Sequence, residues 1–204
     1  GNEDQKQRFL PRLAAGEIGA YSLSEAGAGT DAAALGCRAK LSEDGSHYII
    51  NGEKMWTTGA HRATHLLIFA RTSGKRGDPF GISCFVMPID TAGFSIDEWL
   101  WTFNMPTDHP RVSLKDVWLP DGAILGEIDK GLNVAQHFVH ENRIRQAASS
   151  LGTARFCIQA SVDYANERIT FGKPLSMNQS IQFKVAELSI DYEMIKALTM
   201  TVAE

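Results

Sequence analysis

Short apolar runs separated by turn residues occupy the first part of the chain, between about Ala20 and Leu119. The runs recur at roughly ten-residue intervals, which is typical of a small antiparallel β-sandwich or barrel. Those that we interpret as strands cover residues 47–50, 66–70, 82–87, 94–99 and 112–117. Asp44-Gly45 and Asn51-Gly52 predict hairpin turns. A doubly wound parallel sheet is not expected, because no helical stretch of about ten residues separates the runs.

The apolar spacing changes to three or four residues after Gly131, which predicts long amphipathic helices. The stripe of the first helix comprises Ile144, Ala147, Leu151, Ala154, Ile158, Val162 and Ala165. This helix is expected to end near residues 170–174, which include Gly172 and Pro174. The second is expected from about Asn178, with Ile181, Val185, Leu188, Tyr192 and Ile195 on its inner stripe. A further helical pattern covers residues 5–13 and is closed by Gly16.

These patterns predict an α+β chain with several domains: an antiparallel β-sandwich or barrel, followed by long helices of an incomplete α-helical bundle. Two long amphipathic helices cannot bury both apolar stripes against one small β-domain. We therefore expect the chain to be a piece of a larger protein, cut inside a helical bundle at both ends. Gly152, inside the first long helix, is expected to mark close helix packing.

The composition is that of an ordinary globular protein, with 44% hydrophobic and 22% charged residues among 204. Its 20 basic and 24 acidic residues give a net charge of −4, which does not suggest a nucleic-acid or anionic-membrane partner. No apolar run reaches the roughly 18 residues of a membrane helix. The first residues do not resemble a signal peptide, and three widely spaced cysteines fit a reducing compartment. We therefore expect an intracellular protein that is not secreted.

The segment 21–31 combines a strand end with two glycines, hydroxyls and carboxylates. Gly27 and Gly29 let backbone N–H groups approach a ligand, and Ser24 and Thr30 add adaptable hydrogen-bonding groups. A tight turn followed by an Asp31 cap is the alternative interpretation. A dinucleotide fingerprint is disfavoured, because the pattern predicts hairpins after this segment in place of a βαβ unit.

Two further segments carry candidate chemistry. In residues 51–60, Trp56 is followed by two threonines, a pattern that suits stacking on an aromatic cofactor and hydrogen bonding to its edge. A core tryptophan with strand threonines is the alternative. At a helix end, Arg168 lies near Tyr164 and Phe171. The arginine is suited either to a phosphate or to the helix C-terminus.

Together, and in this order, these motifs resemble those of the flavin-dependent acyl-CoA dehydrogenases. Residues 21–31 match the family signature Tyr-x-x-[Ser/Thr]-Glu-x-Gly-[Ala/Ser]-Gly-[Ser/Thr]-Asp, with Ala26 in place of a common proline. Residues 51–58 match Asn-Gly-x-Lys-x-Trp-x-Thr. Arg143 with Gly152, residues 164–172 and Gln179 fit the helical signature. The resemblance covers nearly the whole chain.

The resemblance implies three parts: the tail of an N-terminal helical domain at 1–15, a middle β-domain at 16–121, and the first helices of a C-terminal four-helix domain at 122–204. It implies FAD as cofactor, with the strand Tyr21–Ser24 along the flavin, Trp56 packed on the rings and Thr58 near N5. The implied cofactor-binding residues are Tyr21, Leu23, Ser24, Gly29, Trp56, Thr58, Arg168, Phe171 and Gln179, and the implied substrate-binding residues are Thr30 and Arg143.

Within this resemblance, Gly29 and Thr30 line the substrate side, and Arg143 lies on the active-site face of its helix. Arg168, Phe171 and Gln179 reach the FAD of a neighbouring subunit. The implied activity is α,β-dehydrogenation of an acyl-CoA thioester, with electron-transfer flavoprotein as acceptor and a homodimer or homotetramer as assembly. An acyl-CoA oxidase on the same fold and a non-catalytic homologue are the alternatives.

The catalytic base is where the chain departs from the family. One branch carries a glutamate immediately before the arginine that matches Arg143, and here that residue is Asn142. Glu141 is one residue away, roughly 100° round a helix. We expect the base beyond Glu204, so that residues 1–204 alone are inactive.

Two other features bear on ligand binding. The stretch 105–111 is shorter than in many members of the family, which puts contacts to the CoA nucleotide there in doubt. The pairs His61 with His65 and His137 with Glu141 have metal-like spacing but no third ligand, and no metal site is expected.

Overall fold

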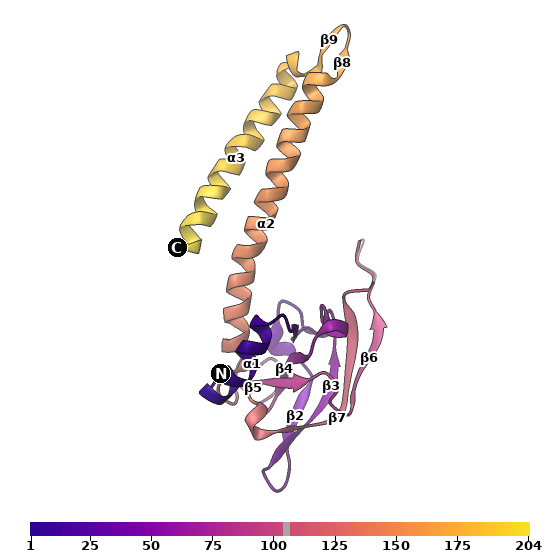
Figure 1. The fold of residues 1–204 in the computed structure, drawn as a ribbon, viewed down its shortest axis with the longest axis vertical. Coiled ribbons are helices and arrows are strands. Elements are labelled where there is room, and N and C mark those ends of the chain that lie inside the picture. Colours follow the sequence, from indigo (N-terminus) through magenta and orange to yellow (C-terminus); the bar gives the residue numbers. More distant parts are fainter. Residues whose placement is uncertain (104–106) are drawn as a thin grey trace. The chain divides into compact units, whose positions relative to one another are not determined.

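The computed structural model describes residues 1–103 and 107–204. They form two compact units, Gly1–Gln136 and His137–Glu204. The first unit contains a β-sheet and a short helix, α1 (Glu3–Ala14), and the second contains long helices (Figure 1). The predicted α+β class is confirmed by this division into a sheet and separate helices.

The sheet of the first unit has seven strands among the described residues. They are β1 (Gly19–Ser22), β2 (Arg38–Leu41), β3 (His47–Lys54), β4 (His65–Arg71), β5 (Ile82–Pro88), β6 (Phe94–Trp99) and β7 (Pro110–Pro120). Their order is β1-β4-β2-β3-β7-β6, with β5 paired to β4. The five apolar runs read as strands in the sequence correspond to β3 through β7.

The sheet is mixed, whereas the turn spacing predicted an antiparallel one. β1 and β2 both pair in parallel with β4, and β5 pairs antiparallel with it. β1 lies along the first residues of β4, as far as Ser22 opposite Ile68, and β2 meets its last residue, with Arg38 opposite Arg71. The chain thus leaves one edge of β4 after Ser22 and returns to it at Arg38. The segment between them, which carries the first motif, lies outside the sheet.

Asn51-Gly52 lies inside β3, so the hairpin predicted there is wrong. The register between β3 and β7 shifts between Ile50 and Gly52, which is a β-bulge. Gly52 has a φ of 156°, and a Cβ on it would lie 2.7 Å from the Cβ of Cys37. Glycine is required here because the backbone of β3 passes directly against Cys37, and it marks a close approach in place of a turn.

The hairpin predicted at Asp44-Gly45 is present, between β2 and β3. Gly45 has a φ of 71°, in the left-handed region that favours glycine. The Asp44 carboxylate accepts hydrogen bonds from the hydroxyls of Ser42 and Ser46. These bonds stabilise the ionised form and lower the pKa of Asp44 to about 2.

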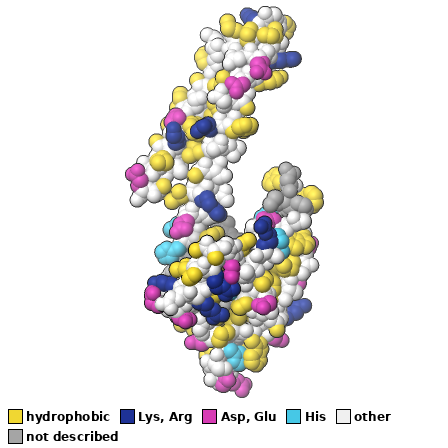
Figure 2. All heavy atoms as spheres, in the orientation of Figure 1, with side chains coloured by type: hydrophobic (Ala, Val, Ile, Leu, Met, Phe, Trp, Pro, Cys, Tyr) yellow, Lys and Arg dark blue, Asp and Glu magenta, His cyan; other side chains and the backbone are white. Residues whose placement is uncertain are grey.

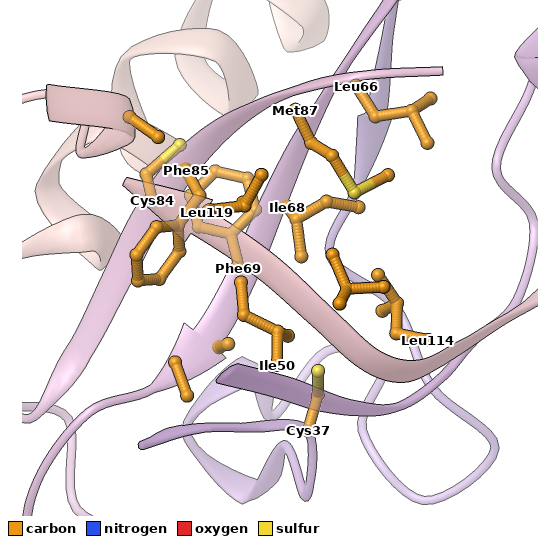
Figure 3. Close-up of a cluster of buried hydrophobic side chains, with 14 of the residues drawn as sticks. Cys37, Ile50, Leu66, Ile68, Phe69, Cys84, Phe85, Met87, Leu114 and Leu119 are labelled. Carbon is orange, nitrogen blue, oxygen red and sulfur yellow. The ribbon is translucent and has the colours of Figure 1, made fainter. Parts of the chain in front are cut away.

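The core of the first unit lies between the strands (Figure 3). Its buried side chains include Cys37, Ile50, Leu66, Ile68, Phe69, Cys84, Phe85, Met87, Leu114 and Leu119. Helix α1 begins with a capping box formed by Asn2 and Gln5, and the Gln5 side chain donates to the carbonyls of Gly122 and Ile124. The 5–13 pattern is thereby confirmed as a helix that is tied to the sheet unit.

The long helices are α2 (Gly131–Glu167) and α3 (Gln179–Ala203), joined by the short strands β8 (Ile169–Thr170) and β9 (Lys173–Pro174). Most of α2 belongs to the second unit. The stripe predicted on α2 is its less exposed face, and Ala165 is fully buried. α3 begins directly after Asn178, as predicted. Within the described residues, no helix has the length and apolar character to cross a membrane.

Two expectations for the helices are corrected. On α3, Leu188 and Ile195 were placed on an inner stripe, yet they remain 53% and 52% exposed, because a helix pair covers only part of each surface. A Cβ on Gly152 would meet nothing within 4 Å, so no close packing occurs there. Hydrophobic side chains are exposed along both helices in Figure 2. The most exposed include Phe156, Phe183, Leu198 and Met200.

The bulge at Gly52 gives a stability prediction. Gly52→Ala is expected to lower the free energy of unfolding by about 1–3 kcal/mol, because the added methyl group overlaps Cys37. Gly122→Ala is the matched control, since a Cβ on Gly122 meets nothing within 4 Å. Urea denaturation measures both. Equal stability of the two variants would contradict the close approach.

Candidate functional site

Two motif-bearing loops of the first unit meet where their strands end. β1 ends at Ser22 and β3 ends at Lys54. Just beyond these ends, the amide N–H of Met55 donates to the carbonyl of Ser24 at 2.9 Å. The structure therefore brings together the segments around Ser24 and Trp56, which are about thirty residues apart in the sequence.

A buried ion pair fixes the junction. The Lys54 side chain is completely buried, and its Nζ donates to the carbonyl of Leu23 at 3.1 Å and to Oε1 of Glu25 at 2.8 Å. The same carboxylate accepts from the amide of Gly36 at 2.5 Å and from the amide of Cys37 at 3.0 Å. Lys54 and Glu25 together thus join the end of β3 to both ends of the loop that leaves the sheet after β1.

Hydroxyl and backbone contacts extend the junction to a third segment. The hydroxyls of Ser22 and Thr57 lie 3.0 Å apart in the interior. The amide of Thr57 donates to the carbonyl of Pro110 at 3.2 Å, and that of Gly59 donates to the carbonyl of Asp108 at 2.9 Å. Buried Thr57 is therefore structural, whereas its neighbours on either side face outward.

Trp56 and Thr58 are the outward-facing residues of this loop. Trp56 is 45% exposed and has a φ of 60°, a strained conformation for a residue with a large side chain. The core-tryptophan alternative is therefore wrong for Trp56. Thr58 is exposed as well, and its Oγ1 lies 2.8 Å from Nδ1 of His109. The loop that is hydrogen-bonded to Ser24 through Met55 thus exposes an aromatic ring and, two residues later, a hydroxyl.

Tyr21 and Leu23 are partly buried and pack against the core. The Tyr21 ring packs against Phe69 with centroids 5.0 Å apart, and burial raises the pKa of its phenol. Leu23 also packs against the core, while its carbonyl is held by Lys54. Both side chains therefore act at least in part as packing residues.

The loop after β1 does contain the tight turn weighed as an alternative. Glu25 and Ala28 exchange backbone hydrogen bonds at 3.0 and 3.1 Å around Ala26-Gly27. Asp31 stands before a short 3₁₀ helix, but its side chain makes no capping hydrogen bond. Of the alternative interpretation, the tight turn is therefore present at residues 25–28, whereas the Asp31 cap is absent.

Gly29 and Thr30, which follow that turn, are exposed. A Cβ on Gly29 would meet nothing within 4 Å, so the backbone there is open to an approaching group. Gly29 and Thr30 belong to the same loop as Ser24, which follows β1.

In the second unit, Arg168, Phe171 and Gln179 lie at one end of the helix pair. Phe171 and Gly172 form the two-residue turn between β8 and β9, both with positive φ. Phe171 is fully exposed in this strained conformation. Arg143 lies 25 residues before Arg168, roughly 37 Å along a helix. One small group therefore cannot touch both arginines of the same chain.

The carboxylates considered as bases have different surroundings in the structure. Glu25 is already an acceptor for Lys54 and two amides, so it is occupied by the junction. Glu141 is an exposed residue of α2, and Asn142 accepts a hydrogen bond from Arg145.

Each histidine of the pair at positions 61 and 65 packs against an aromatic ring. His65 contacts the Phe9 ring and His61 contacts the Trp99 ring. No group of three or more potential metal ligands occurs in the described part of the chain. Of the stretch 105–111, positions 105 and 106 lie outside the described residues.

Two features of the site were missed in the sequence. The Lys54–Glu25 pair joins residues 29 apart, and nothing in the local pattern singles out these two charges as partners. His109 joins Thr58 across 51 residues, and nothing in the local pattern indicates the contact.

The comparisons with known proteins agree with the division of the chain into two units. Residues 20–117 match the family model described as "Acyl-CoA dehydrogenase, middle domain", and residues 129–204 match "Acyl-CoA dehydrogenase, C-terminal domain". The chain belongs to the acyl-CoA dehydrogenase family. The resemblance deduced from the motifs is thereby confirmed.

Individual members of the family are similar to the chain in sequence and in structure. The chain is 36% identical over 204 residues to the mitochondrial short/branched chain specific acyl-CoA dehydrogenase of Rattus norvegicus, covering all of this chain and 46% of that one. The structure of butyryl-CoA dehydrogenase from Megasphaera elsdenii superposes with a TM-score of 0.90 at 33% identity, covering 98% of this chain and 52% of the other.

An acyl-CoA dehydrogenase from Bacillus anthracis, solved as a complex with FAD, has a TM-score of 0.89 at 31% identity, covering 100% of this chain and 34% of that one. The chain thus spans about half the length of the curated relatives it matches.

The buried pair gives the second prediction. Lys54→Met is expected to lower the free energy of unfolding by about 3–5 kcal/mol, because it leaves the Glu25 carboxylate without its cation. The double variant Lys54→Met/Glu25→Gln should lose less than the single one. Lys40→Met, at an exposed position of β2, is the control and should change stability by no more than about 0.5 kcal/mol. A single variant as stable as the control would show that the pair does not hold the junction.

Proposed function

We propose that this chain is the flavin-binding part of an FAD-dependent acyl-CoA dehydrogenase, which removes hydrogens from the α and β carbons of an acyl-CoA thioester. The observation that carries the proposal is the junction of two strand ends, which joins the Ser24 segment to the loop that exposes Trp56 and Thr58. Membership of the family supports the same conclusion.

The residues present fit a flavin. An exposed, fixed aromatic plane at Trp56 suits stacking on a tricyclic ring, and the hydroxyls of Ser24 and Thr58 suit the polar atoms along its edge. Gly29 leaves the backbone open beside them. Neither metal chemistry nor a nucleophilic side chain is needed to account for this set of residues.

When bound, FAD supplies the acceptor for the hydride that leaves the β carbon. The chain's own part is to bind and orient. Ser24 and Thr58 hold the ring in one position, and Trp56 covers a face of it and excludes water. Thr30 and Arg143 are proposed to contact the substrate, and Tyr21, Leu23 and Gly29 to line the cofactor through backbone atoms or packing.

Removal of the α-proton needs a carboxylate within hydrogen-bond reach of the substrate. Glu25 is engaged by the junction, and Asn142 is an amide without useful proton affinity. We therefore propose that the base is supplied by sequence beyond Glu204, and that residues 1–204 alone do not turn over acyl-CoA.

The end of the helix pair suits a role in assembly. A strained and fully exposed Phe171 beside Arg168 and Gln179 is explained if these residues contact FAD bound to a neighbouring subunit of a homodimer or homotetramer. The guanidinium of Arg168 suits pyrophosphate oxygens.

The remaining proposals follow from the family. They are a domain division at 1–15, 16–121 and 122–204, electron-transfer flavoprotein as electron acceptor, and a location in the bacterial cytoplasm or an organelle matrix. A mitochondrial relative supports the location.

The test is anaerobic mixing of the purified full-length protein with acyl-CoA esters of several chain lengths. The protein is expected to be yellow and to bleach with at least one ester, and residues 1–204 alone, supplied with excess FAD, should not bleach. Rapid reoxidation by air would favour an oxidase over a dehydrogenase. A colourless full-length protein that binds no FAD would contradict the proposal and favour a non-catalytic homologue.

A further inference from the structure

The two glycines of the segment 25–31 have different surroundings. A Cβ on Gly29 would meet nothing within 4 Å, whereas a Cβ on Gly27 would lie 2.6 Å from Nη2 of Arg76. Gly27 is not among the glycines with positive φ, so its backbone conformation is one that other residues also adopt. The missing side chain at Gly27 therefore makes room for an arginine of the same chain. Of the two glycines, Gly29 is the one that leaves the backbone open.

Arg76 bridges two sides of the loop that follows β1. Its Nε donates to the carbonyl of Ala34 at 2.5 Å, and its Nη2 donates to the carbonyl of Gly27 at 3.4 Å. A planar guanidinium carries its N–H donors in a fixed fork, so it can hold two carbonyls at once. The residues that lie between these two acceptors along the chain include Gly29 and Thr30.

The backbone beside Arg76 is fixed, although its side chain is exposed. The amide of Gly77 donates to the carbonyl of Ala33 at 2.9 Å, and the buried guanidinium of Arg71 donates to the same carbonyl at 2.8 Å. Ala33 thus ties the loop between β4 and β5 to the loop after β1. Arg76 extends this tie across to the turn that contains Gly27.

Both acceptors of Arg76 are backbone carbonyls, and none of the described carboxylates forms a salt bridge with it. Bonds to carbonyls on two sides of a loop restrict the path of the chain between them. We infer that Arg76 is a positioning residue, whose bridge across the loop keeps Gly29 and Thr30 in one conformation.

The inference rests on the proposed function, in which Thr30 contacts the acyl-CoA substrate. A substrate binds the fraction of molecules whose loop is already in the binding conformation, and its apparent dissociation constant rises as that fraction falls. Without the bridge, the loop is expected to leave this conformation for part of the time. Once substrate is bound, the loop has the same conformation with or without Arg76, so the chemical step is unchanged. FAD binding is also expected to stay unchanged, since the bond between Ser24 and Met55 does not involve Arg76.

The test compares two substitutions that remove the same bridge from opposite sides. Arg76→Met removes the guanidinium and keeps an unbranched side chain. Gly27→Ala adds a methyl group where Nη2 of Arg76 lies, and the end of this flexible side chain can move aside without a change of the backbone. Lys75→Met is the matched control. It removes a neighbouring exposed charge whose ammonium forms no hydrogen bond to the described residues.

Steady-state kinetics of the full-length protein with FAD separate KM from kcat, using the acyl-CoA ester that bleaches the wild type most readily. Arg76→Met and Gly27→Ala are each expected to raise KM by about three- to tenfold, as for the loss of one ordinary hydrogen bond, with kcat within about twofold. The double variant should equal the single ones, because the bridge can be lost only once. Lys75→Met should change KM by less than about twofold.

Hydrogen exchange gives a second readout that needs neither substrate nor cofactor. The amides of residues 28–33 should exchange faster in Arg76→Met and in Gly27→Ala than in the wild type, because the loop opens more often. Lys75→Met should leave their exchange unchanged.

The outcomes separate this inference from the proposed function. Unchanged KM or unchanged exchange in Arg76→Met would overturn the inference, as would additive effects in the double variant or an equal rise of KM in Lys75→Met. Loss of FAD from Arg76→Met would overturn it as well, because the arginine would then support the cofactor. In each of these cases the wild-type protein still binds FAD and turns over, so the proposed function stands. A wild-type protein that binds no FAD would overturn the proposed function and this inference with it.

Discussion

The buried Lys54–Glu25 pair is the interaction on which the site depends. A lysine completely removed from water costs free energy unless its charge is compensated, and here a carboxylate and a carbonyl oxygen compensate it. The carboxylate is fixed in turn by the amides of Gly36 and Cys37. Since Trp56 and Thr58 follow Lys54 within four residues, the position of the pair also sets the position of the outward-facing groups.

Neighbouring contacts explain how the chain tolerates backbone strain at two exposed aromatic residues. Trp56 and Phe171 both have positive φ, at 60° and 50°, and both are exposed. Such conformations persist only where neighbouring contacts over-determine them. Around Trp56 these are the Met55–Ser24 bond and the Thr57 contacts, and around Phe171 the β8–β9 pairing. An exposed aromatic ring whose backbone conformation is fixed suits stacking on a flat group.

Local chemistry made much of the fold predictable. Asp44-Gly45 and the helical stripe on α2 depend on neighbours a few residues away, so their patterns predict them directly. Asn51-Gly52 has the sequence of a typical hairpin turn. Its glycine is required instead because the backbone passes close to Cys37, a contact that only the tertiary structure reveals.

The same limit applies to the site and to the parallel pairing of β1 with β4. Ser24, Trp56 and Thr58 were singled out by their motifs. The partners that hold them, Lys54 with Glu25 and Thr58 with His109, lie 29 and 51 residues apart. Pairings over such separations follow from the path of the chain, between β1 and β2 for Glu25 and around β3 and β7 for Thr58 and His109, which hydrophobic alternation does not encode.

The central claim is that the loops after β1 and β3 form the flavin surface. The most direct measurement is the FAD dissociation constant of the full-length protein with Trp56→Ala, compared with Trp118→Ala. Trp118 is likewise exposed, but it stacks on His47 away from these loops. Removal of the Trp56 ring is expected to weaken FAD binding by about tenfold and to change the flavin spectrum, while Trp118→Ala leaves both unchanged. Equal affinities and spectra in the two variants would contradict the account.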